Sequence, residues 1–269
     1  MHKLFNNILV PVDNLQYSVK AVEKAVQFSK QFSCDVHLLH AIGDPIWKFS
    51  LSRKISEKKF QLHELRDQLA SLLPAGCLLH ASVANGSPEK SIEEYVAINR
   101  IDLVIALKQG GMLGSLNARM NINRLAGRIG CPVLSLQSRP SFEDIRNIVL
   151  PVGDNLPLRK MMLAIYLAKQ SNAAIHLITL SKNNASSSKS QVYLEKTYQL
   201  LRENTGYAIK CSTVVGENIA DTTLEYARNV EADLILVNPG SESLLSGPMN
   251  RLFSKFLFNS SSIPVLTVA

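Results

Sequence analysis

The chain has 269 residues, of which 46% are hydrophobic and 19% charged. This balance is typical of a globular protein and excludes a disordered one, and the length suits two ordinary domains. The formal net charge is +7: residues 1–140 carry 17 Lys and Arg against 11 Asp and Glu, which gives +6, and residues 141–269 carry 12 against 11, which gives +1. A basic excess can attract nucleotides, nucleic acid or an acidic surface, but we favour a solvated face.

The N-terminal apolar run is interrupted by Pro11 and Asp13 and lacks a small-residue cleavage site, so it does not resemble a signal peptide. No run approaches the roughly 18 apolar residues of a membrane-spanning helix. The four cysteines lie in or beside apolar runs, form no C-x-x-C pair, and are expected to be small buried hydrophobic residues. They are Cys34, Cys77, Cys131 and Cys211. This usage favours a reducing compartment, and the sequence predicts a cytoplasmic protein without membrane segments.

The first half alternates strand-like apolar runs with segments of helical period. Its first run, residues 8–12, is apolar at both alternate sets of positions and stops at Asp13, which predicts a strand buried on both faces. Val19, Val22, Val26, Ser29 and Phe32 recur at helical spacing and predict the next helix. Further strands are expected at 35–42, 77–83, 103–107 and 132–136, with helices at 53–72, after 88, and up to about 129.

The second half repeats this order after a polar segment. We predict a first domain over residues 1–137, a linker over 138–147 that contains Pro140, and a second domain over 148–269. Strands are expected at 148–152, 174–180, 208–215, 233–237 and 264–268. The first helix of this half is predicted to bury Leu158, Met161, Met162, Ile165 and Ala168.

The correspondence between the halves is the strongest signal in the sequence. Matched residues are Pro11 and Pro151, Gly86 and Gly216, Asp102 and Asp233, and Pro132 and Pro264. Self-similarity of such long period indicates a duplicated domain. Alternating strands and helices predict a parallel sheet covered on both faces in each copy.

The motifs that carry the duplication resemble the universal stress protein family in its tandem two-domain form. They are Val10-Pro11-Val12-Asp13, Gly86-Ser87-Pro88, Asp102-Leu103-Val104-Ile105 and Cys131-Pro132-Val133-Leu134. The resemblance implies an α/β fold with two tandem doubly wound domains. Each would be adenine nucleotide alpha hydrolase-like, with a five-stranded parallel sheet in the order 3-2-1-4-5.

The resemblance also implies that the halves pair through their fifth strands, Pro132–Leu136 and Pro264–Val268, as an internal pseudo-dimer. Such pairing would cover two exposed strand edges. A homodimer of the whole chain is compatible with this expectation, and protein partners are not specified by the sequence.

In this strand order the winding reverses between the first and fourth strands, where an open α/β sheet keeps its ligand crevice. Nucleotide-binding family members carry there a motif of Gly, two residues, Gly, nine residues, and Gly-Ser or Gly-Thr, which holds phosphates at a helix start. This sequence departs from the motif in both halves. The candidate nucleotide pocket of the first half comprises Pro11, Asp13, Gly110, Gly111, Gly114, Ser115 and Arg119, with Arg124 as an alternative source of charge. The weaker second-half set comprises Asp154, Gly240 and Ser241. We favour a decayed site, and a modified phosphate pocket is the alternative.

Other candidate residues point to structural roles. His37 and His176 match across the repeat inside strands and are expected to be hydrogen-bonded core residues. No His or Cys pair has metal-ligand spacing, and no Ser-His-Asp or paired-carboxylate arrangement is evident. Arg119, Arg124 and Arg128 lack neighbouring aromatic residues that could stack on bases, so nucleic-acid binding is disfavoured.

Three functions remain in competition. The leading hypothesis is a non-catalytic stress-response module that binds partners or a small ligand. The alternative is an ATP-binding protein, with slow hydrolysis in the first domain. Nucleic-acid binding is the weakest.

Overall fold

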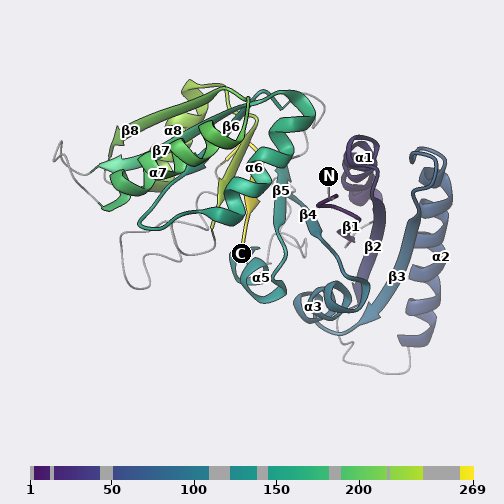
Figure 1. Cartoon of the computed structure of the whole chain (residues 1–269). Coiled ribbons are helices and arrows are strands. Elements are labelled where there is room, and N and C mark those ends of the chain that lie inside the picture. The colour runs from purple at the N-terminus through teal and green to yellow at the C-terminus, as the bar shows by residue number, and fades with distance from the viewer. Residues whose placement is uncertain are drawn as a thin grey trace. The chain divides into compact units, whose positions relative to one another are not determined.

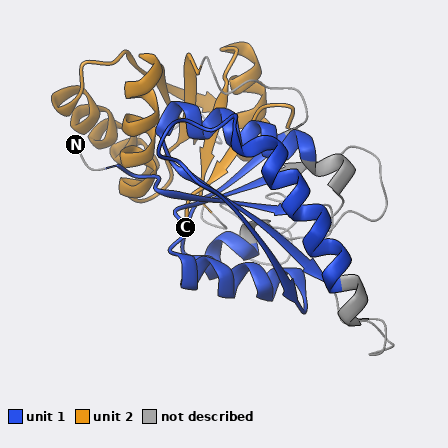
Figure 2. Cartoon of the chain, turned by 90° about the vertical axis from the view of Figure 1, so that its right-hand side faces the viewer, with its two compact units in different colours: residues 1–143 blue, residues 144–269 orange. Residues whose placement is uncertain are grey.

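The computed structural model describes residues 3–12, 15–42, 51–108, 122–137, 145–181, 189–216, 219–238 and 261–269. The chain forms two compact units, residues 1–143 and residues 144–269 (Figure 2). Each unit alternates strands with helices along the chain (Figure 1). None of the helices in the described segments is long and apolar enough to cross a membrane.

Unit 1 contains a parallel sheet in the order β3-β2-β1-β4-β5. The strands are β1 (Asn7–Val12), β2 (Asp35–Ile42), β3 (Leu79–Asn85), β4 (Leu103–Lys108) and β5 (Val133–Gln137). The helices described are α1 (Leu15–Phe32), α2 (Leu51–Ala70), α3 (Pro88–Asn99) and α5 (Ile122–Ile129). Helix α1 packs beside α2, and α3 beside α5.

Unit 2 repeats the arrangement, in the order β8-β7-β6-β9-β10. Its strands are β6 (Asn147–Pro151), β7 (Ala174–Ser181), β8 (Ile209–Val215), β9 (Leu234–Val237) and β10 (Val265–Thr267). The helices described are α6 (Leu158–Ser171), α7 (Lys189–Asn204) and α8 (Ile219–Asn229). Numbered within each unit, both sheets have the predicted order 3-2-1-4-5. The predicted pairing of the fifth strands concerns the relation between the units and stays a prediction, as does a homodimer.

The central strand of each sheet is buried on both faces, as its apolar sequence predicts. Ile8, Leu9 and Val10 are fully buried in β1, and the corresponding run 148–150 is fully buried in β6. Full burial of an aliphatic side chain of this size contributes about 1.5–3 kcal/mol. These two runs therefore form the centre of each core.

The buried face predicted for α6 is wrong at two positions. Leu158 is 58% exposed and Met162 is 59% exposed, whereas Lys160, Leu163 and Ala164 are buried. The physical reason is a contact that helical period does not show: Lys160 Nζ donates to the carbonyl oxygen of Pro151 at 2.6 Å. The helix therefore turns the side of Lys160 toward the end of β6.

The expected burial of the cysteines holds for Cys34 and Cys131 but is wrong for Cys211. Cys34 and Cys131 are buried, Cys77 is partly buried, and Cys211 is exposed. Cys211 lies in β8, an outer strand of its sheet in which several side chains are exposed. All four cysteines are free.

The matched glycines after β3 and β8 provide a test of local geometry. Gly86 has φ +127°, a conformation that side chains disfavour, and a Cβ at Gly216 would collide with the Thr222 hydroxyl and lie 3.2 Å from its Cβ and Cγ2. We expect Gly86→Ala and Gly216→Ala each to lower the free energy of unfolding by about 1–3 kcal/mol. Gly127→Ala in α5 is the control, since its Cβ would meet open space and alanine favours a helix by up to about 1 kcal/mol. Urea unfolding measures all three, and equal effects at the three positions would contradict the prediction.

Candidate functional site

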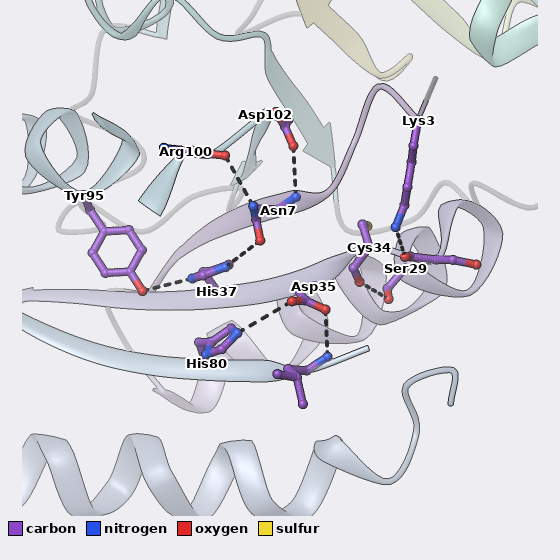
Figure 3. A network of polar contacts seen from close by, with 12 residues as sticks. Lys3, Asn7, Ser29, Cys34, Asp35, His37, His80, Tyr95, Arg100 and Asp102 are labelled. Carbon is purple, nitrogen blue, oxygen red and sulfur yellow. Dashed lines mark hydrogen bonds and ion pairs between the residues drawn. The ribbon is translucent and has the colours of Figure 1, made fainter. Parts of the chain in front are cut away.

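The buried His37 of β2 lies at the centre of a part-buried polar network in unit 1 (Figure 3). Its Nε2 lies 3.3 Å from Asn7 Oδ1, and its Nδ1 lies 3.1 Å from the Tyr95 hydroxyl oxygen. The Tyr95 hydroxyl also lies 3.3 Å from Ser82 Oγ. The network thus joins the first three strands of the sheet to α3.

Unit 2 builds the same network from the matched residues. His176 Nε2 lies 3.1 Å from Asn147 Oδ1, and its Nδ1 lies 3.2 Å from the Tyr226 hydroxyl, which lies 3.3 Å from Ser212 Oγ. The expectation that both histidines are hydrogen-bonded core residues is confirmed. We name the two sets, Asn7–His37–Tyr95–Ser82 and Asn147–His176–Tyr226–Ser212, the polar frames.

Burial keeps both histidines neutral near neutral pH. It lowers the pKa of His37 to about 4, with a further contribution from the charge of His80, whose ring stacks on it. Burial, followed by the charge of Lys210, also lowers the pKa of His176. A neutral imidazole donates from one nitrogen and accepts at the other. Because the Asn Oδ1 atoms only accept, Nε2–H donates to Asn and the Tyr hydroxyl donates to Nδ1.

The sequence reasoning found the histidines but missed their partners. Asn7 and Asn147, Tyr95 and Tyr226, and Ser82 and Ser212 are identical pairs at matched positions. That identity was the available signal. The partners lie 13 to 58 positions apart along the chain, so no local motif contains them.

A second matched contact ties the start of the fourth strand to the start of the first. Asp102 Oδ2 accepts the backbone N–H groups of Asn6 at 2.7 Å and Asn7 at 3.0 Å. In unit 2, Asp233 Oδ2 accepts those of Arg146 at 2.7 Å and Asn147 at 2.9 Å. These carboxylates fix the two strands that border the crevice, and their role is structural.

The carboxyl ends of β1 and β6, where the strand order reverses, are held by side chains of the protein. In unit 1, His40 Nδ1 donates to the Val12 carbonyl oxygen at 2.6 Å. At the matched place in unit 2, Thr179 Oγ1 donates to the Val152 carbonyl oxygen at 2.9 Å. The buried Lys160 side chain donates to the carbonyl oxygen of Pro151, the residue before Val152. Each crevice edge is thus fixed by protein hydrogen bonds, with different chemistry in the two units.

Most predicted pocket residues lie outside the described segments. These are Asp13, Gly110, Gly111, Gly114, Ser115, Arg119, Gly240 and Ser241. Pro11 is buried within β1, and Asp154 is exposed in the turn between β6 and α6. Of the two sets, the structure thus places only Pro11 and Asp154, together with Arg124, the alternative source of charge, in α5.

Of the basic residues of α5, Arg128 lies beside acidic side chains of α3. Arg128 Nη1 lies 3.8 Å from Glu89 Oε2 and 4.0 Å from Glu93 Oε2 of α3. The side chain of Arg124 is exposed. Within the described parts of the chain, no three His, Cys, Asp or Glu side chains are grouped to hold a metal ion.

Comparison with solved structures places the whole chain in one fold. A universal stress protein from Archaeoglobus fulgidus is 15% identical, with a TM-score of 0.76 over 98% of this chain and 97% of that chain. A putative universal stress protein from Pseudomonas aeruginosa is 16% identical, with a TM-score of 0.63 over 98% and 93%. The cytoplasmic domain of a prokaryotic cation chloride cotransporter is 13% identical, with a TM-score of 0.51 over 98% and 95%. Identities this low show the shared fold alone.

Comparison of the sequence gives the family. No curated protein matches the chain, but the model of the universal stress protein family matches residues 4–136, which lie within unit 1. Unit 2 repeats the strand order, the polar frame and the aspartate contact of unit 1. The chain therefore belongs to the universal stress protein family, in a tandem form with two α/β units.

Proposed function

We propose that this protein is a stress-response module that acts by binding a partner or a small ligand and does not catalyse a reaction. The observation that supports this most is that polar side chains at the carboxyl ends of the central strands form hydrogen bonds with the protein backbone. His40, Thr179 and Lys160 each donate to a backbone carbonyl at the end of the central strand. Side chains held in this way give a rigid edge against which a ligand can bind.

Phosphate release from ATP tests the non-catalytic part of the proposal. The full chain and the variant Asp13→Ala are incubated with ATP and Mg²⁺, and inorganic phosphate is measured against a blank without protein. The expected rate equals the blank for both proteins. A rate that scales with the concentration of the natural chain and disappears in Asp13→Ala would overturn the proposal.

Adenine-nucleotide binding in unit 1 is the second candidate, and the strand order of that unit favours it. The sheet reverses between β1 and β4, and an open α/β sheet keeps its ligand crevice at the carboxyl ends of the strands where the order reverses. In the sequence the segments that follow these two strands carry Asp13 and the stretch 108–115. Glycines at such a place let backbone N–H groups approach a phosphate.

Calorimetric titration with ATP tests the second candidate. Trp47, the one tryptophan of the chain, follows β2 in the sequence and provides a second signal through its fluorescence. If nucleotide binds to unit 1, saturable heat and a shift of Trp47 emission are expected, both lost in Asp13→Ala and retained in the matched control Asp154→Ala. Absence of heat and of an emission change would eliminate this candidate and leave the first.

A further inference from the structure

Cys34 and Cys77 lie just before the amino-terminal ends of the neighbouring strands β2 and β3. The parallel register of these strands pairs Val36 with Leu79. Cys34 and Cys77 each lie two residues before that pair, so continuing the register back by two residues sets them opposite each other. Neighbouring strands lie about 4.8 Å apart, which falls within the Cα–Cα range of about 4.4–6.8 Å that a disulfide spans.

Two hydrogen bonds extend this register beyond the ends of the strands. The Val36 N–H donates to the Leu78 carbonyl oxygen at 2.9 Å, and the Leu78 N–H donates to Asp35 Oδ1 at 2.9 Å. Both contacts involve residues directly adjacent to Cys34 or Cys77. The chain that follows each of the two cysteines is therefore held in place.

The pattern of burial indicates that both thiols face the same side of the sheet. Leu78 is 59% exposed, whereas Leu79 is 8% exposed and Cys77 is partly buried. On the neighbouring strand, Cys34 is fully buried and Asp35 is partly exposed. Since alternate residues of an extended chain share a face, Cys34 and Cys77 lie on the covered side.

The electrostatic environment of Cys34 also indicates that the two thiols are close. Burial raises the pKa of Cys34 to about 12, and the next contribution is the charge of Cys77. No other cysteine contributes to the pKa of Cys34. Proximity to Cys77 thus rests on the register and, separately, on this coupling.

We propose that Cys34 and Cys77 form an oxidisable dithiol site that hydroperoxides convert to an intramolecular disulfide. The partly exposed Cys77 thiolate attacks the peroxide, the O–O bond breaks, and a sulfenic acid and one water or alcohol are formed. Cys34 then attacks the Cys77 sulfur and displaces the hydroxyl group, which leaves as water with the proton of the Cys34 thiol. Two thiols thus lose two electrons and two protons to one peroxide, and a thiol reductant reverses the change.

The corresponding positions of unit 2 carry no thiol. There the register pairs Ile175 with Ile209, so Ala173 and Tyr207 stand where unit 1 has its cysteines. The dithiol site is therefore specific to unit 1, although both units share the same strand arrangement. The remaining cysteines, Cys131 and Cys211, serve as matched controls.

Peptide mapping of the oxidised full chain tests the proposal. The protein is treated with hydrogen peroxide, free thiols are blocked with an alkylating reagent, and the digest is analysed by mass spectrometry without reduction. The expected result is a cross-linked pair of peptides containing Cys34 and Cys77, lost in Cys77→Ser and unchanged in Cys131→Ser and Cys211→Ser. Because burial disfavours the Cys34 thiolate, the cross-link should form faster as the pH rises.

Labelling with dimedone, which reacts with sulfenic acids, provides a second measurement that does not depend on the Cys77 variant. In Cys34→Ser the sulfenic acid of Cys77 has no partner, so dimedone labelling of Cys77 should rise relative to the natural chain. If the natural chain is oxidised and both Cys34 and Cys77 are still alkylated, the proposal is wrong. A disulfide that joins two molecules, or that includes Cys131 or Cys211, would equally overturn it.

Discussion

Replacing His37 with alanine is expected to lower the free energy of unfolding of unit 1 by about 3 kcal/mol. The change removes a buried ring and leaves Asn7 Oδ1 and the Tyr95 hydroxyl without their shared partner. A cavity and a part-buried polar group that loses its partner each cost about 1–3 kcal/mol, and the Tyr95 hydroxyl retains its contact with Ser82. Urea unfolding monitored by circular dichroism measures the effect.

The control for this prediction is His80→Ala. The His80 side chain is 42% exposed and its Nε2 lies 3.8 Å from Asp35 Oδ2, and exposed polar contacts of this kind contribute about 0–1 kcal/mol. His176→Ala should reproduce the loss of His37→Ala in unit 2, since its polar frame is the same. Equal small effects of His37→Ala and His80→Ala would show that the polar frame does not stabilise the unit.

Acidification is expected to destabilise the protein between about pH 6.5 and pH 4, in part through His37. Its pKa is about 4 in the folded chain against 6.5 for an unperturbed histidine. Below pH 6.5 the unfolded chain therefore binds a proton that the folded chain does not, and stability falls as pH falls. The difference corresponds to at most about 3 kcal/mol, complete below about pH 4. The lowered pKa of His176 acts in the same direction.

The measurement is the urea midpoint of unfolding at pH 7.5 and pH 4.5 for the natural chain and for His37→Gln. The variant retains an amide that can hydrogen-bond but cannot titrate, so its midpoint should fall less on acidification. Comparing the two proteins removes the contribution of carboxylates elsewhere. If both lose the same stability, His37 is not held neutral by its surroundings.

The order of elements could be predicted because it depends on local patterns. The strand expected at 35–42 is β2 as observed, and the matched Pro11 and Pro151 both lie in the central strands. The helix faces were harder: Leu158 and Met162 continue an apolar period but are exposed, because the neighbouring Lys160 binds the end of β6. The helical spacing of apolar residues alone does not show which face of α6 packs against the sheet.

The candidate site could be predicted only in part, for a different reason. The strand reversal follows from strand order, and Asp102 and Asp233 were recognised as matched residues. Their bonds to the backbone of the first strand were not foreseen, because they join residues that lie about 90 positions apart. The difference between His40 and Thr179 at the crevice edges has no local sequence signature either.

Hydrogen exchange of backbone amides, followed by mass spectrometry, tests the central claim that each half is a complete unit held by its own polar frame. In His37→Ala the account predicts faster exchange across residues 1–143 with little change in 144–269, and the reverse pattern in His176→Ala. Exchange that rises equally in both halves for either variant would contradict it, because the chain would then behave as one structure and not as a doubled one.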